Sequence, residues 1–273
     1  MGVPCRIVAG GNERPYARTP APMIADIWFY ALAVPAVLIA GISKGGFGSG
    51  LVVMAVPLMA LVVPPPQAAA VMLPILVAMD LTAFWTYRKS FDRGHLKVVL
   101  PASVIGIAVG RATFGFLNAA AVRLLVGVLA VTFPLGYWLK LKPPAIPAGS
   151  ARLWGGLWGA VSGFTSFVAH AGGPPVLVYL LPQKLEKRLF VGTLVVFFMV
   201  VNGLKLIPYG QLGQFHAGNL LTSAVLLPLA PVGIWLGLWM QNRIPDRAFY
   251  GVCYVLLFST GVKLCWDGVA GLV

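Results

Sequence analysis

Two glycine-rich stretches contain the residues of this sequence that could bind a ligand. The first reads GISKGGFGSG at residues 41–50, and the second reads AHAGGPP at residues 169–175. Each interrupts an apolar run with small residues and one basic or titratable side chain, Lys44 in the first and His170 in the second. Small residues let the backbone approach a ligand, and the free N–H groups at the start of the following short helix attract an anion. The two stretches together therefore predict an anion site.

We expect the anion to contact both stretches and one residue outside them, Asn202. The candidates are Ser43, Lys44, Gly45, Gly46, Gly48, Ser49 and Gly50 from the first stretch, and His170, Gly172, Gly173 and Pro174 from the second. A proline near a helix start removes no hydrogen bond there, because the first amides of a helix are unpaired. The alternative is that the glycines only permit close packing of helices.

Four ionisable residues in or near apolar segments each have two interpretations, because a charge at membrane depth is a functional candidate by default. Lys44 pairs with the anion or is a cytoplasmic lysine on a hairpin tip. His170 binds the anion or carries a coupling proton, or it is a structural histidine bonded to nearby carbonyls. Asp80 is a proton carrier or, as we favour, a packing residue paired with a basic neighbour. Lys205 lines the pathway or, as we favour, extends to the outer interface.

Other site chemistries do not fit these motifs. The first stretch lacks the G-K-[ST] of a phosphate-binding loop, and it follows an apolar helix where a dinucleotide motif would follow a strand. Histidine, cysteine and acidic residues show no zinc spacing, and no Ser–His–Asp arrangement is suggested. The three cysteines, Cys5, Cys253 and Cys265, have no metal or disulfide spacing. The sequence therefore predicts that the protein is not an enzyme and that it has no cofactor or metal.

The composition indicates a helical protein that crosses a membrane several times. Of its 273 residues, 59% are hydrophobic and only 10% are charged, whereas about a quarter would be charged in a soluble domain. The net charge of +13 comes mostly from basic residues in short loops between apolar segments. Such loops orient a membrane protein with its positive side inward, so the charge does not indicate nucleic-acid binding. We predict an all-α, polytopic integral membrane protein.

Ten apolar segments divide the chain, and two of them are too short to cross a bilayer alone. They lie at 24–42, 51–63, 68–87, 97–117, 121–139, 153–169, 174–182, 189–208, 219–240 and 248–266. A spanning helix needs about 20 residues, and the short segments 51–63 and 174–182 each follow a glycine-rich stretch. We favour three full crossings in each half plus one broken, re-entrant hairpin, with about eight transmembrane helices. The sequence leaves ten separate segments as an alternative.

The two halves of the chain share a repeated pattern. Asp80 and Asn202 are 122 residues apart, as are Tyr87 and Tyr209, while Gly50 and Gly173 are 123 apart. PASVIGIAVG at 101–110 also resembles PLAPVGIWLG at 228–237, so both halves contain a small-xxx-small pair that lets helix backbones approach closely. We predict a first repeat at 23–140, a cytoplasmic linker at 141–152 and a second repeat at 153–273.

Loop charges predict that these repeats are inverted. The basic loops are 87–97, 140–152, 183–188 and 241–247, and the nearly uncharged loops are 64–67, 118–120 and 208–219. Placing the basic set in the cytoplasm makes the first repeat begin outside and the second begin inside, as in many secondary transporters. The polar, proline-rich residues 1–22 are expected to form a disordered tail, and Met23 is an alternative translation start.

The second glycine-rich stretch and the segment after it resemble the TauE/SafE sulfite exporter family, also called the TSUP permeases. The residues that carry the resemblance are Gly172, Gly173, Pro174, Tyr179, Leu180, Pro182, Thr193, Asn202 and Lys205. The resemblance covers about 24–267. The first stretch departs from the family pattern, because many members read Gly-x-Gly-Gly-Gly where this chain has GFGSG, with Ser49 among the glycines. The resemblance implies a transporter of small sulfur-containing anions, such as sulfite, sulfonates or related organic anions, in the bacterial inner membrane.

Two functions of different classes follow from these features. The first is a secondary anion transporter driven by the proton gradient, with Asp80 or His170 as the proton site and Lys205 along the pathway. The second is a membrane scaffold or accessory protein in which the glycine breaks serve packing alone. The expected partners are a small anion and the lipid bilayer. The sequence leaves the oligomeric state open, a homodimer included.

Overall fold

The regular elements of the protein are helices throughout the residues that the structure describes, as the all-α prediction requires. The computed structural model describes residues 23–47, 50–114, 116, 118–140, 150–240, 243 and 246–272. The predicted tail 1–22 and most of the predicted linker lie outside these residues. The first half contains α1 (Ile27–Gly46), the 3₁₀-helix η1 (Gly50–Met54), α2 (Ala55–Met59), α3 (Pro65–Tyr87), α4 (Arg93–Phe114) and α5 (Ala119–Trp138).

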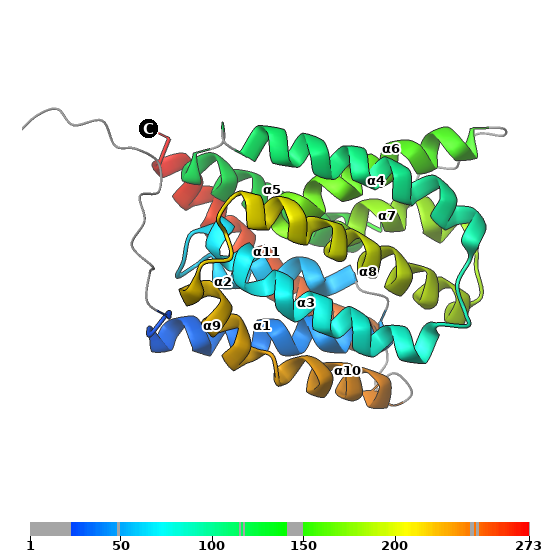
Figure 1. Cartoon of the computed structure of the whole chain (residues 1–273), viewed down its shortest axis with the longest axis horizontal. Coiled ribbons are helices and arrows are strands. Elements are labelled where there is room, and N and C mark those ends of the chain that lie inside the picture. Colours follow the sequence, from blue (N-terminus) through cyan, green and yellow to red (C-terminus); the bar gives the residue numbers. More distant parts are fainter. Residues whose placement is uncertain are drawn as a thin grey trace, which may run out of the picture.

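The second half contains α6 (Ala151–Ala169), α7 (Gly173–Leu180), the 3₁₀-helix η2 (Leu181–Gln183), α8 (Lys187–Gln211), α9 (Ala217–Leu226), α10 (Leu229–Met240) and α11 (Asp246–Ala270). Each of the ten apolar segments coincides with a helix or with two consecutive helices. The long helices lie roughly side by side along the long axis of the molecule (Figure 1).

Several helices have the length and surface of membrane spans. Within the described residues, five stretches are long and apolar enough to cross a bilayer, namely Ile27–Gly46, Pro65–Tyr87, Arg93–Phe114, Arg188–Gln211 and Ala217–Met240. Large apolar side chains also point outward, as with Trp28 at 71% exposure and Trp266 at 75%. Such a surface suits lipid. The expected total of about eight transmembrane helices remains a prediction.

The two small-xxx-small pairs bring helix backbones into contact, as the sequence predicted. Gly106 and Gly110 of α4 face α6, where a Cβ added at Gly110 would lie 2.8 Å from the ring of Phe167. In the other pair, Gly233 and Gly237 of α10 face α1, and a Cβ at Gly233 would lie 2.9 Å from the Cα of Gly41. Any side chain larger than hydrogen would push these helices apart.

The two short segments turn back into the molecule and meet there. The chain leaves α1, turns and returns through η1 and α2, and it leaves α6, turns and returns through α7, whose residues contact η1. The first of these segments differs from the short helix with free amides that the sequence predicted. It begins as a 3₁₀-helix, and the N–H of Leu51 already donates to Ser43 Oγ at 3.1 Å. The second return is an α-helix from Gly173 onward.

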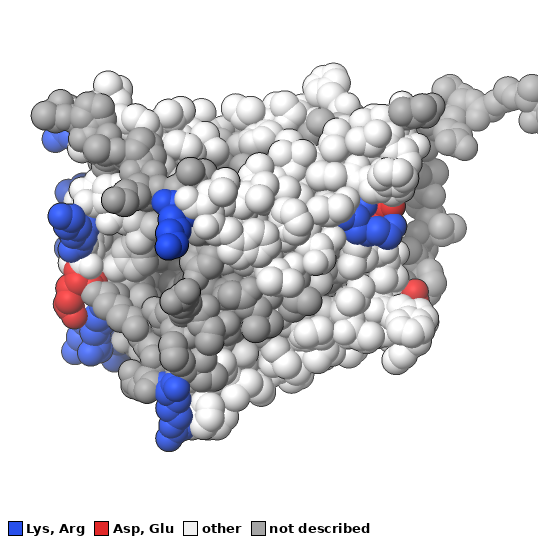
Figure 2. All heavy atoms as spheres, turned by 180° about the vertical axis from the view of Figure 1, so that it is seen from behind, with Lys and Arg blue, Asp and Glu red and all other residues white. Residues whose placement is uncertain are grey.

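Loop 87–97 lies beside the helices that flank loop 183–188. His95 Nδ1 lies 2.9 Å from the hydroxyl of Tyr179 in α7, which precedes loop 183–188. The N–H of Asp92 donates to Thr193 Oγ1 in α8, which follows that loop, at 2.8 Å. Figure 2 shows most of the Lys and Arg side chains of the face that it presents toward the left end, and a further basic group beside an acidic one near the right end. This clustering agrees with loops on one side of a membrane, and the assignment of that side to the cytoplasm remains a prediction.

Candidate substrate site between the two broken helices

A small cavity lies where the two returning segments meet. It is lined by Lys44, Val52, Leu76, Ser166, His170, Gly173, Phe198 and Asn202. Both hairpins contribute to it, and so do the long helices α3 and α8. About 10 Å³ is open to the centre of a water-sized sphere, which is room for roughly one water molecule. An anion larger than water therefore requires a shift of the lining side chains.

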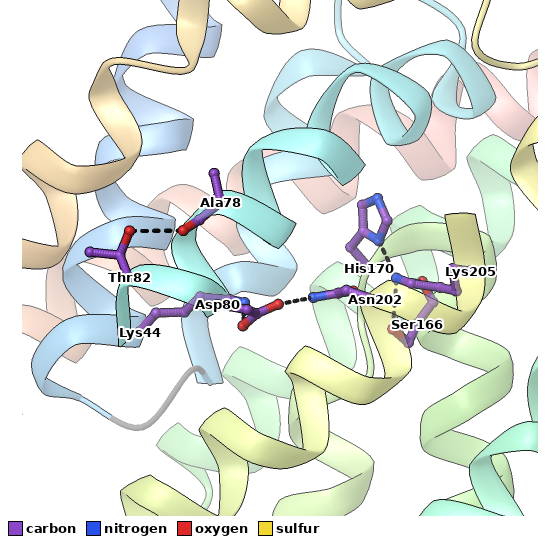
Figure 3. A network of polar contacts seen from close by, with 8 residues as sticks. All are labelled: Lys44, Ala78, Asp80, Thr82, Ser166, His170, Asn202 and Lys205. Carbon is purple, nitrogen blue, oxygen red and sulfur yellow. Dashed lines mark hydrogen bonds and ion pairs between the residues drawn. The ribbon is translucent and has the colours of Figure 1, made fainter. Parts of the chain in front are cut away.

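One wall of the cavity contains a buried ion pair, which we call the Lys44–Asp80–Asn202 group. Lys44 Nζ donates to Asp80 Oδ1, and Asn202 Nδ2 donates to Asp80 Oδ2 at 2.6 Å (Figure 3). The side chains of Lys44 and Asp80 are each 2% exposed. The group links α1, α3 and α8 and has no net charge. Lys44 is thus not an exposed lysine on a hairpin tip, and that interpretation is wrong. Asp80 is paired with a basic neighbour, as the favoured interpretation required.

A second polar cluster, the Lys205–His170–Ser166 group, lies beside the cavity, which His170 and Ser166 line. Lys205 Nζ donates to the carbonyl of Ser166 at 2.9 Å, to Ser166 Oγ at 3.0 Å and to His170 Nδ1 at 2.7 Å (Figure 3). The three donors of an ammonium group thus have three partners. The favoured expectation that Lys205 reaches the outer interface is wrong, because the residue is fully buried. The end of α6 supplies the acceptors that keep it inside.

The contacts of His170 fix its tautomer. Its Nε2 lies 2.8 Å from the carbonyl of Ala69, which can only accept, so Nε2 carries the proton. Its Nδ1 faces the ammonium of Lys205, which can only donate, so Nδ1 keeps its lone pair. The ring is therefore neutral in this arrangement. Both interpretations of His170 remain compatible with this geometry, since it contacts a carbonyl and also lines the cavity.

The backbone of His170 is strained. It ends α6 in the left-handed region, with φ of 52°, and its N–H donates to the carbonyl of Ser166 at 3.1 Å. Glycine usually occupies this position, because a side chain there costs about 1–2 kcal/mol. Such strain is concentrated at functional sites, and here it places an imidazole at the edge of the cavity.

Only four of the predicted anion-binding residues line the cavity, namely Lys44, His170, Gly173 and Asn202. Ser43 instead caps the N–H of Leu51. Gly46 is buried at the end of α1, Gly50 begins η1, and Pro174 is partly exposed. Gly48 and Ser49 lie outside the described residues.

Two of the predicted glycines serve the packing role that the sequence left as an alternative. A Cβ on Gly45 would collide with the backbone of Ile234 in α10. A Cβ on Gly172 would lie 2.8 Å from the carbonyl of Ser162, whose own hydroxyl donates to the Gly172 carbonyl at 2.6 Å. These glycines hold the hairpins against their neighbours.

Four lining residues were not predicted, and only one of them had a signal in the sequence. Ser166 follows Lys44 by 122 residues, the same interval that separates Asp80 from Asn202. Applying that interval to Lys44 would have identified it. Val52, Leu76 and Phe198 are apolar residues in apolar helices, so composition and spacing do not distinguish them from core residues.

Two tyrosines hold the hairpins at corresponding points. Tyr87 donates to the carbonyl of Gly45 at 3.2 Å, and Tyr209 donates to the carbonyl of Phe167 at 2.6 Å. Both the tyrosines and their acceptors are 122 residues apart. The interval that was found from single residues therefore also relates pairs of interacting residues.

Comparison with known proteins identifies a family whose model matches most of this chain. A family model described as "Sulfite exporter TauE/SafE" matches residues 33–264. That range contains all the residues that line the cavity. Comparison with curated proteins and with solved structures gave no match.

Proposed function

Because the chain belongs to the TauE/SafE sulfite exporter family, we propose that it is a secondary transporter of small sulfur-containing anions, such as sulfite or sulfonates, across the bacterial inner membrane. Membership in this family implies a membrane transporter of sulfur anions and not an enzyme. The choice of substrate within that class is our proposal, and so is the proton gradient as its driving force.

The observation that carries this proposal is the cavity between two broken helices. Irregular backbone at membrane depth is tolerated where it is buried in protein or lines a cavity, and here both hairpins contribute lining residues. In the first turn of α7, Pro174 and Pro175 have no N–H and the N–H of Val176 donates to the carbonyl of Gly172 at 3.4 Å. The N–H of Gly173 is therefore the donor that this helix start can offer, and the positive end of the helix dipole favours an anion there. Lys44, Ser166, His170 and Asn202 add polar side chains around the same space.

We also propose that the chain consists of two inverted repeats, and the packing of its helices supports this. The first helix of each half packs on the fourth apolar segment of the other, since α1 contacts α10 and α6 contacts α4. The third segments of the two halves, α3 and α8, contact each other, and so do the fifth, α5 and α11. Exchanging the halves reproduces this set of contacts. Rocking one repeat against the other would then expose the cavity to each side in turn.

Proton coupling requires a group that gains and loses a proton as the anion moves. Asp80 and His170 are the buried candidates, one in each polar group beside the cavity. Transport of a monoanion together with one proton would move no net charge. The proposal therefore predicts uptake that is driven by a pH gradient without a membrane potential.

Flux measurements on the purified protein in liposomes test the transporter function. Labelled sulfite and methanesulfonate should enter or leave faster than in empty liposomes, and an imposed pH gradient should change the rate. Replacing Gly173, which lines the cavity, by valine should abolish the flux. Gly156→Val is the matched control, because a Cβ at Gly156 meets nothing within 4 Å. Flux no greater than in empty liposomes for every small anion tested would favour the scaffold function.

A further inference from the structure

The centre of the protein contains a buried lysine, Lys205, that forms no ion pair with the acidic residues that the structure describes. Among the residues whose burial the structure describes, the buried Lys, His and acidic side chains are Lys44, Asp80, His170 and Lys205. The charges of Lys44 and Asp80 cancel in their ion pair, and the hydrogen bonds of His170 leave its ring neutral. The three acceptors around Lys205 Nζ, two on Ser166 and one on His170, stabilise the ammonium form of Lys205, and in that form the centre has a net charge of about +1.

This charge lacks an acidic partner within the described part of the chain. Ion pairs are seen there only between Lys44 and Asp80 and between Lys263 and Asp267. Lys205 is held instead by the carbonyl and hydroxyl of Ser166 and by the imidazole of His170. Ser166 and His170 both line the cavity. The ammonium group of Lys205 thus contacts two residues that line the cavity, so its positive charge favours an anion there.

A buried charge without a counterion is costly, and a ligand that cancels it is favoured over one that does not. We propose that Lys205 determines ligand specificity by charge, so that the site prefers monoanions, such as a sulfonate or hydrogen sulfite, over dianions and neutral solutes. This inference rests on the proposed function, because it assumes that the cavity is the substrate site. A monoanion leaves the centre neutral, a dianion leaves it negative, and a neutral solute leaves it positive.

Summing the charges of the centre and the ligand in the same way predicts how the ligand preference changes in variants. Lys205→Met lowers the net charge of the centre to zero, so a neutral ligand becomes the favoured one. Asp80→Asn frees the charge of Lys44 and raises the net charge to about +2, so a dianion becomes favoured. Lys205→Arg keeps the charge and should keep the preference for a monoanion. A residue needed only for folding would instead weaken the binding of every ligand alike.

Three probes of similar shape separate charge from size. Dimethyl sulfone, methanesulfonate and sulfate each have four groups around a tetrahedral sulfur, and their charges are zero, minus one and minus two throughout the neutral pH range. Binding of each probe to the purified full-length protein is measured by titration with thermal unfolding as the readout. In the unaltered protein we expect methanesulfonate to bind roughly tenfold or more tightly than the other two.

The order of the probes should then change with the variant. Dimethyl sulfone should bind best to Lys205→Met, and sulfate should bind best to Asp80→Asn. Lys263→Met is the matched control, since it removes a lysine from an exposed pair with Asp267 and should leave the order unchanged. If Lys205→Met does not fold, Asp80→Asn and Lys205→Arg still test the inference.

The results also distinguish failure of this inference from failure of the proposed function. Equal binding of sulfate and methanesulfonate to the unaltered protein would overturn the inference, as would equal weakening of all three probes in the folded variants. Sulfite flux would still be present in that case. Absence of both flux and binding would overturn the proposed function itself.

Discussion

Replacing Lys44 by methionine should destabilise the protein far more than replacing Lys44 and Asp80 together. Both side chains are only 2% exposed, and Lys44 is the cation that pairs with Asp80. Lys44→Met leaves a buried carboxylate with Asn202 as its remaining hydrogen-bond donor. Breaking one partner of a buried pair costs about 3–5 kcal/mol, whereas removing both charges is often close to neutral.

The magnitude can be expressed as a shift in the unfolding temperature. For a chain of about this size, 1 kcal/mol lowers the midpoint by about 2–4 °C, so Lys44→Met should lower it by roughly 6–20 °C. Asp80→Asn should cost a similar amount, because it leaves Lys44 buried without its carboxylate. The double variant Lys44→Met/Asp80→Asn contains no uncompensated charge in this group and should recover most of the loss.

Thermal unfolding of the four proteins in the same detergent measures this cycle, with intrinsic tryptophan fluorescence as the signal. The double variant should be more stable than either single variant, which is the signature of a coupled pair. If the two single losses simply add in the double variant, the residues do not act as a buried ion pair. A loss below about 1 kcal/mol in Lys44→Met would mean that water reaches Asp80 and screens it.

Two further predictions concern packing and the hairpin contacts. Gly106→Val should lower the unfolding temperature strongly, because a Cβ there would lie 2.7 Å from the backbone nitrogen of Phe164 in α6, whereas Gly203→Val, with nothing within 4 Å of its Cβ, should cost little more than helix propensity. Equal losses in the two variants would contradict the close contact of α4 with α6. Tyr209→Phe should cost about 1–3 kcal/mol, because it leaves a buried carbonyl of Phe167 without its side-chain donor. Tyr87→Phe, which loses a longer bond of 3.2 Å to Gly45, should cost less, and the reverse order in thermal unfolding would count against this reading of the two contacts.

Much of the fold could be predicted because it depends on local patterns. Apolar runs located all ten helical segments, and the glycine spacing at Gly106 and Gly233 located two helix contacts. The repeat interval even paired Asp80 with Asn202, which the structure joins by a hydrogen bond of 2.6 Å. These features could be predicted because hydrophobic length, small-residue spacing and internal similarity are written directly in the sequence.

The site could be predicted only in part, because burial of single polar residues depends on tertiary packing. A lysine near the end of an apolar helix can extend to the interface or point inward, and its hydropathy is the same in both cases. Lys205 lies three residues after Asn202 and therefore on the same face of α8, which was the available sign that it points inward. The capping of Leu51 by Ser43 depends on how the hairpin closes, and the glycine pattern does not specify that.

The charge of the centre arises from differences between the two proposed repeats. With the interval of 122 residues, Lys44 corresponds to Ser166, Asp80 to Asn202, and Lys205 to Ala83. Two identical halves with the first repeat's residues would contain two ion pairs and no net charge. The second half lacks the acid and has a lysine one turn further along α8, so one positive charge remains without an acidic partner among the described residues. The symmetry that we propose would account for the position of the cavity, while the departures from it account for the ligand charge that we propose the cavity selects.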